Sequence, residues 1–299
     1  MAYTATVQGL GGAADQRSAR TSMAAVLAGL AVCLVLVTAG TVWRLTGGKW
    51  AIIETPSMGV AAPVGTLILT RPALPADLSV GDIVTYRPRN MPDNLITHRV
   101  VAILDDGSVQ VRGDINGAVD PFPVTQDDLV GEVVAHYRGL GWLVRGLPTL
   151  LLGIVVLVIG SALYVPTRWR SSVRILGSTM LVAVTSLIVR PFVHPVLVTV
   201  AATGDGLHAT IVSGGLLPTR VTGLPGHHVD LHLGEVGSVP VAANAAGGPL
   251  MVNGAPHLTG WWLVAMIVVC LIPLLWTTIV GLTAELPTDT YPTDEGRLP

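Results

Sequence analysis

Four apolar stretches, each about as long as a bilayer is thick, constrain this chain of 299 residues more than any other feature. A helix rises 1.5 Å per residue, so about 20 apolar residues are needed to cross the roughly 30 Å of hydrocarbon in a bilayer. Hydrophobic residues make up 51% of the chain and charged residues 12%, which is unlike a soluble globular domain. We therefore expect transmembrane helices at 22–43, 147–165, 175–193 and 258–282.

Two of these spans admit an alternative. Arg190 interrupts the apolar run of the third, so a re-entrant or tilted segment would also fit there. The first span, preceded by Arg17 and Arg20, resembles a cleaved secretory signal, but its apolar run is about 20 residues long where a signal has about 7 to 15. We therefore favour a retained anchor and four crossings.

The placement of arginine predicts the orientation of the spans. Arg17 and Arg20 precede the first span, and Arg168, Arg170 and Arg174 fill the short loop between the second and the third. Positively charged loops stay on the cytoplasmic side of a membrane. Both flanks are therefore expected in the cytoplasm, in a multi-pass protein of the cell membrane.

This orientation divides the chain into domains. The N-terminus, residues 1–21, is polar and expected to be disordered in the cytoplasm. Residues 44–146 and 195–257 fall outside the cytoplasm, and the tail at 283–299 returns to it. Cys33 and Cys270 both lie within spans, so no disulfide is expected to hold the extracytoplasmic parts.

Both extracytoplasmic regions have β character. In residues 44–146, short runs with β-branched residues are separated by Pro and Gly, which favours a β-barrel or sandwich over a βαβ unit. The strands expected there are 65–70, 82–87, 97–104, 108–111 and 129–137. A smaller β module is expected at 195–257, with strands at 208–212, 228–233 and 239–242.

The predicted fold class is therefore an α+β membrane protein. A mostly-β domain follows a transmembrane anchor, and three further transmembrane helices follow that domain, with the small β module inserted before the last. The lipid bilayer is one expected partner. The net charge of −2 provides no basic surface for nucleic acid.

No cofactor or metal is expected. His227, His228, Asp230 and His232 lie close together in the second module, and three of them share one face of a strand. A metal site needs three or four convergent ligands. A polar strand facing solvent is the simpler interpretation of these residues.

Ser57 is the first candidate for chemistry, because it follows Thr55 and Pro56 at the entrance of the β domain, close to the membrane. A serine hydroxyl is a weak nucleophile, so a lysine or histidine must lie within hydrogen-bond reach as a general base. The single lysine of the chain, Lys49, lies in the membrane-proximal linker, where an interfacial anchor is the simpler interpretation. A Ser-Lys dyad is therefore disfavoured.

Histidine is the remaining base. The β domain holds His98 and His136, and His98 is preferred because carboxylates follow it in the loop from Arg112 to Pro121. A catalytic imidazole needs a carboxylate to orient it, and either Asp114 or Asp120 could serve. The alternatives are a half-buried structural histidine and ordinary turn-forming aspartates.

Five short blocks together resemble a known family. They are Ser57-Met58, a Gly at 65, Val80-Gly81-Asp82-Ile83-Val84, His98-Arg99-Val100 and Gly113-Asp114-Ile115-Asn116. In this combination, which covers about residues 52–140, the chain is similar to type I signal peptidases of the archaeal and endoplasmic-reticulum branch, whose active site is Ser-His-Asp.

The resemblance implies a membrane-bound serine endopeptidase that cleaves signal peptides from secretory precursor proteins, after small residues at −1 and −3, on the outer face of the membrane. It implies Ser57 as nucleophile, His98 as general base, Asp120 as the orienting acid and Asp114 as a second essential carboxylate. Thr55 and the Ser57 backbone N–H would stabilise the oxyanion. Whether accessory subunits take part is left open by the sequence.

The chain departs from the family pattern beside the serine. Pro56 stands where glycine is usual, Val60 where proline is usual, and Thr66 where Gly-Asp is expected. None of these changes removes a reacting group. They motivate an alternative hypothesis, a non-catalytic signal-peptidase-like membrane protein that binds or assembles extracytoplasmic partners.

Overall fold

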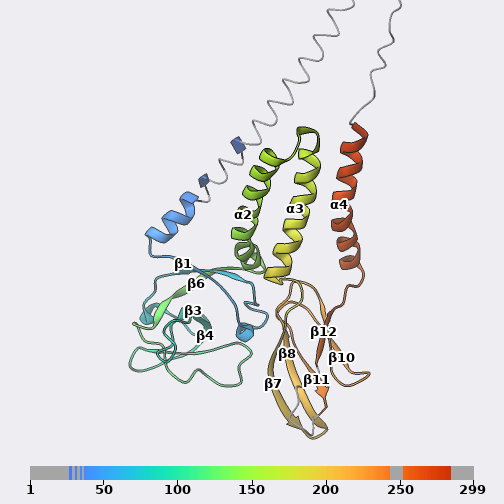
Figure 1. The fold of residues 1–299 in the computed structure, drawn as a ribbon. Coiled ribbons are helices and arrows are strands. Elements are labelled where there is room, and N and C mark those ends of the chain that lie inside the picture. The colour runs from blue at the N-terminus through green and yellow to red at the C-terminus, as the bar shows by residue number, and fades with distance from the viewer. Residues whose placement is uncertain (1–26, 29–30, 32–33, 36, 243–251, 284–299) are drawn as a thin grey trace, which may run out of the picture. The chain divides into compact units, whose positions relative to one another are not determined.

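The structure is a computed structural model and describes residues 27–28, 31, 34–35, 37–242 and 252–283 (Figure 1). The predictions for 1–21 and for the tail from 284 onward lie outside these residues, as does much of the first span. The residues of that span that are described, between 27 and 45, are helical. The chain forms two compact units, of which one includes residues 68–112 and 119–135, and the other includes 52–67, 113–118 and the chain from 136 onward.

The β domain is built on one six-stranded sheet with the order β1-β2-β6-β3-β4-β5. The β3–β4, β4–β5 and β3–β6 pairs are antiparallel, as expected for strands joined without helical crossovers. All the strands predicted here are confirmed to within two residues, and β1 is an additional strand. The bounds are β1 (Lys49–Ile52), β2 (Leu67–Arg71), β3 (Ile83–Tyr86), β4 (Ile96–Ile103), β5 (Val109–Arg112) and β6 (Leu129–Tyr137).

Alternation along β3 and β4 builds one face of the core. Val84 lies opposite His98 in the β3–β4 register, so the two side chains share a face, whereas Thr85 and Thr97 share the other and hydrogen-bond at 2.9 Å. Burial of each valine contributes about 1.5–3 kcal/mol, and these contributions fix the strand register. The buried core residues are Leu78, Val84, Tyr86, Val100, Val109, Val111 and Val124.

Two long helices, α2 (Leu140–Tyr164) and α3 (Thr167–Val189), lie side by side (Figure 1). Glycines at the interface allow the close approach that is common between membrane helices: a Cβ on Gly153 would lie 2.2 Å from Leu181 Cδ1. Where the helices meet, Arg170 donates to the Ala162 and Val165 carbonyls. These bonds satisfy carbonyls at the end of α2 that have no helical partner.

Both helices are long and apolar enough to cross a membrane. Their most apolar windows have mean hydropathies of 2.3 and 1.8 and are only 11% and 6% buried within the protein, unlike the core helix of a soluble protein. These properties support membrane association. The fourth predicted span corresponds to α4 (Trp261–Thr283), with a shorter apolar segment at Trp261–Ile272.

The helices do not have the same bounds as the predicted second and third spans, 147–165 and 175–193. α2 begins seven residues before the predicted start at 147 and continues through Pro148, although that proline cannot donate to the carbonyl of Val144. α3 ends at Val189 rather than 193, because Arg190 takes a left-handed conformation with φ 53°. The apolar runs therefore indicate the C-terminal part of α2 and of α3 and miss the first seven and eight residues of these helices.

The first turn of α2 contacts the loop before β2. The Gly141 N–H donates to the Gly65 carbonyl at 2.9 Å. The Trp142 indole is buried against Gly65 and lies edge-on to His194, with ring centroids 6.3 Å apart. These contacts join α2 to the loop before β2 within one unit.

The predicted β module at 195–257 is a sandwich of two three-stranded antiparallel sheets, with orders β11-β8-β7 and β10-β9-β12. Aliphatic side chains from both sheets form its core, among them Ile211, Val221 and Val239. The three strands predicted here are present with shifted ends. The bounds are β7 (Pro195–Thr203), β8 (Gly206–Ser213), β9 (Thr219–Thr222), β10 (His228–Leu231), β11 (Val236–Val241) and β12 (Asn253–Pro256).

Candidate active site

His98 and Asp120 form a short polar contact in the β domain. His98 lies on β4 between Ile96 and Val100 of the same face, and its side chain is buried among the core residues. Its Nδ1 lies 2.5 Å from Oδ2 of Asp120. Asp120 is positioned by its own backbone N–H, which donates to the Val111 carbonyl on β5. Of the two carboxylates considered from the sequence, Asp120 is therefore the one that contacts the His98 ring.

Tyr86 is a third member of this group and was missed by the sequence reasoning. It lies on β3, on the face shared by Val84 and His98. Its hydroxyl donates to the same oxygen, Oδ2 of Asp120, at 2.5 Å. The apolar alternation of β3 predicts that Tyr86 faces inward, but its position beside His98 depends on the register between two strands.

The electrostatics of this group fix the proton on the ring. Burial alone would raise the pKa of Asp120, but the hydrogen bonds from His98 and Tyr86 outweigh burial and hold that pKa below its usual value. Burial and the hydrogen bond to Asp120 raise the pKa of the Tyr86 phenol, which therefore remains a donor. An ionised carboxylate can only accept, so the hydrogen between the two groups belongs to His98 Nδ1, and in the neutral ring Nε2 is then the acceptor.

Ser57 lies in a single 3-10 turn, η1 (Pro56–Met58), and is partly exposed. Thr55 precedes the turn in an extended conformation, and Met58 is completely buried beneath it. Gly59 closes the turn with φ 50° and ψ −129°, where a side chain is strained, and donates to the Pro56 carbonyl at 2.8 Å. The turn thus has a defined shape at the serine.

The structure also accounts for the proline beside the serine. Pro56 occupies the first position of the turn, where no backbone N–H is needed and its fixed φ suits the helical conformation. Thr66, another departure from the family pattern, is completely buried, and its backbone bonds to Ile53 and Pro63 close the loop before β2. Pro56 therefore fits its turn, whereas the buried Thr66 hydroxyl has no hydrogen-bond partner among the described residues.

The loop that carries Asp114 contacts the serine turn. The Ile115 N–H donates to the Ser57 carbonyl at 3.1 Å, and a Cβ on Gly113 would lie 2.8 Å from the same oxygen. Asp114 itself is exposed. The structure therefore brings the predicted residues together in two groups, Ser57 with the Asp114 loop in one compact unit and His98 with Asp120 in the other.

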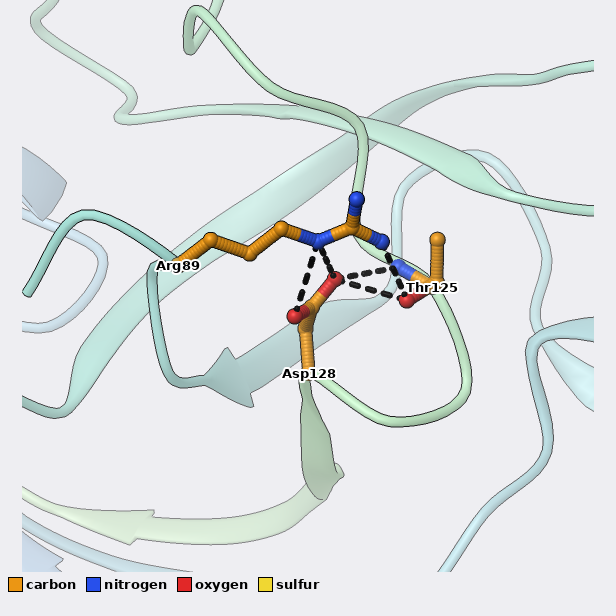
Figure 2. A network of polar contacts seen from close by, with 3 residues as sticks. All are labelled: Arg89, Thr125 and Asp128. Carbon is orange, nitrogen blue, oxygen red and sulfur yellow. Dashed lines mark hydrogen bonds and ion pairs between the residues drawn. The ribbon is translucent and has the colours of Figure 1, made fainter. Parts of the chain in front are cut away.

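A cavity of about 110 Å³ adjoins Asp120. Asp120 and Tyr86 contribute to its wall, together with apolar side chains such as Ile96 and Phe122. Figure 2 shows how one part of the lining is fixed: Asp128 accepts from Arg89 Nε at 3.1 and 3.2 Å and from the Thr125 hydroxyl at 2.7 Å. The Arg89 Nη2 also donates to the Thr125 hydroxyl.

Asp230 of the histidine-rich strand in the β module has a structural role. Asp230 binds the Arg220 guanidinium through both oxygens at 2.6 and 2.7 Å, and His257 lies beside them. In the part of the chain that the structure describes, no group of three or more His, Cys, Asp or Glu side chains is arranged to hold a metal ion.

Lys49, the alternative to histidine as general base, has an exposed side chain at the start of β1.

Comparison with models of protein families and with curated protein sequences finds no match for this chain.

Proposed function

We propose that this chain is a membrane-bound serine endopeptidase of the signal peptidase I type, which cleaves signal peptides from secretory precursor proteins. The observation that carries this proposal is the 2.5 Å contact between His98 Nδ1 and Asp120 Oδ2, which leaves Nε2 as a proton acceptor. The resemblance of five sequence blocks to the signal peptidase family supports it independently.

The proposed reaction is an acyl transfer through Ser57. His98 Nε2 removes the hydroxyl proton as Ser57 Oγ attacks the scissile carbonyl, and Asp120 stabilises the resulting imidazolium. The Ser57 backbone N–H and the Thr55 hydroxyl stabilise the oxyanion. The imidazolium then protonates the leaving amine, and water hydrolyses the acyl-enzyme with His98 again as base. The mechanism requires Ser57 Oγ to come within hydrogen-bond distance of Nε2.

Membrane attachment fits such a substrate. In the proposed topology α2 and α3 are two of four spans, and the β domain and the β module lie outside the cytoplasm. An anchored enzyme and an anchored precursor share two dimensions, which raises their effective concentration. The substrate would lie as an extended segment, as is common for peptides that bind β domains.

Cleavage of a model precursor in proteoliposomes tests the proposal. Ser57→Ala and His98→Ala should each abolish cleavage, with a loss of about 10³-fold or more for a triad member. Retained cleavage in either variant would contradict the proposal. Two variants serve as controls, Ser79→Ala and His136→Ala, because both residues are exposed in the same β domain.

A serine-directed phosphonate probe distinguishes the non-catalytic alternative. Labelling of the wild-type chain but not of Ser57→Ala would support an activated serine. An unlabelled wild-type chain would instead favour a binding protein that keeps the peptidase-like domain.

A further inference from the structure

We propose that the β module at 195–257 positions the loop that carries Ser57, and that Gly234 is the positioning residue through which it acts. The inference rests on the proposed function of Ser57 as a nucleophile. It assigns a role to a module that the signal peptidase resemblance does not cover.

The contact lies between two turns of the same compact unit. A Cβ added to Gly234 would lie 2.7 Å from the Gly59 carbonyl oxygen and 2.9 Å from Val60 Cα. Both are backbone atoms, which cannot yield as a flexible side chain can. The module therefore touches the chain two and three residues after Ser57.

Hydrogen bonds within the β module hold the turn that contains Gly234. The Gly234 N–H donates to the Ser213 carbonyl at 2.7 Å, and the Ser213 N–H donates to the Glu235 carbonyl at 3.0 Å. The Glu235 carboxylate accepts from the His232 N–H at 2.8 Å. These bonds tie the turn between β10 and β11 to the end of β8, so the turn moves with the sandwich core.

A second contact reaches the other end of the serine loop. A Cβ on Gly214, next to the end of β8, would lie 3.1 Å from Val64 Cβ. Val64 is 3% exposed, so it is packed rather than free to shift. The module thus abuts the loop both after the nucleophile and before β2.

On its other side the serine turn is bound by the Asp114 loop. Ile115 donates to the Ser57 carbonyl, and a Cβ on Gly59 would lie 2.6 Å from Ile115 Cγ2. Gly59 is therefore enclosed between Ile115 and Gly234. Displacing the module turn would shift the backbone that directs the Ser57 hydroxyl and the Ser57 N–H.

The chain offers a matched pair of variants. Gly234 and Gly226 both have φ of +83°, in the left-handed region where a side chain is strained. A Cβ on Gly226 meets nothing within 4 Å, whereas one on Gly234 meets the serine loop. The difference between Gly234→Ala and Gly226→Ala therefore isolates the contact from the backbone strain.

In the full-length protein in proteoliposomes, Gly234→Ala should slow phosphonate labelling of Ser57 and lower kcat for precursor cleavage about 10- to 100-fold relative to Gly226→Ala, with KM unchanged. Equal labelling and cleavage rates in the two variants would overturn the inference. Circular dichroism verifies that both variants fold.

Hydrogen exchange provides a readout that does not depend on catalysis. The amides of Gly59 and Ala61 bond to Pro56 and Met58 within the serine loop, and Gly234→Ala should speed their exchange while Gly226→Ala does not. If the wild-type chain neither labels nor cleaves, the proposed function fails, and this exchange difference still tests the positioning role. Unchanged exchange in Gly234→Ala would overturn the positioning role. If Gly234→Ala does not fold, the same measurement is made on Gly214→Ala.

Discussion

Tyr86 and His98 donate to the same oxygen of one carboxylate, Oδ2 of Asp120, each at 2.5 Å. The three side chains come from β3, β4 and the segment that follows the Asp114 loop. Two donors on one oxygen hold the carboxylate in a single orientation, and that orientation determines which nitrogen of His98 carries the proton. The relationship makes Tyr86 a supporting residue of the proposed active site.

We expect Tyr86→Phe to destabilise the protein by about 1.5–3 kcal/mol, because it removes a buried hydrogen bond to a charged group. It should also reduce precursor cleavage without abolishing it, since Asp120 keeps its bond to His98. Thermal unfolding in detergent and a cleavage assay measure the two effects. The exposed Tyr137→Phe is the control, and equal behaviour of the two variants would show that the Tyr86 hydroxyl is dispensable.

Asp120 should make the stability of the protein depend on pH in the acid range. Its pKa is lowered in the folded state from an ordinary value of 3.8, so its ionised form stabilises the fold above that pH, and the stabilisation is lost as the pH falls through the folded pKa. The stability difference between the wild type and Asp120→Asn should therefore be constant near neutral pH and shrink below about pH 3.8. Unfolding midpoints measured from pH 7 to pH 2 test this, and a difference that is undiminished at pH 2 would refute it.

In the polar network of Figure 2, alanine substitution should reduce the stability of the protein more at Asp128 than at Arg89. Asp128 is largely buried and accepts from the Thr125 N–H and hydroxyl as well as from Arg89, so Asp128→Ala should cost about 1.5–3 kcal/mol. Arg89 is 60% exposed, and Arg89→Ala should cost less than about 1 kcal/mol. Denaturant unfolding of both variants measures the contrast, and equal losses would contradict it.

Packing between α2 and α3 should depend on Gly153. Valine at that position would meet Leu181, whereas a Cβ on Gly160 in the same helix meets nothing within 4 Å. Gly153→Val should therefore lower stability in detergent by about 1–3 kcal/mol more than Gly160→Val. Because both variants make the same change in helix propensity, a similar melting temperature for the two would show that the helices do not need this close approach.

The strands of the β domain could be predicted because their pattern is local. Val84 and Tyr86 alternate with Thr85, and His98 alternates with Ile96 and Val100, so the inward face is readable from each strand alone. The role of Tyr86 could not be read in this way, because it depends on which residue of β4 lies opposite Val84. That pairing is set by the core as a whole.

The start of α2 and the contact between the β module and the serine loop could not be predicted from the sequence either. The first two turns of α2 contain Gly141, Arg145 and Gly146, which interrupt the apolar run, yet Trp142 and a backbone bond to Gly65 hold the start of the helix in place. The contact between Gly234 and Gly59 joins residues far apart in the chain. Both residues are glycines, so no side-chain pattern in the sequence predicts their contact.

The buried indole of Trp142 provides the protein with an internal optical probe. Trp50, Trp169, Trp261 and Trp262 are between 40% and 78% exposed, whereas Trp142 is 7% exposed. In a variant that keeps Trp142 as its single tryptophan, any separation of α2 from the loop at Gly65 should shift the emission of this indole to the red. The start of this helix can therefore be followed by light emission, with no label added, while the protein is embedded in lipid.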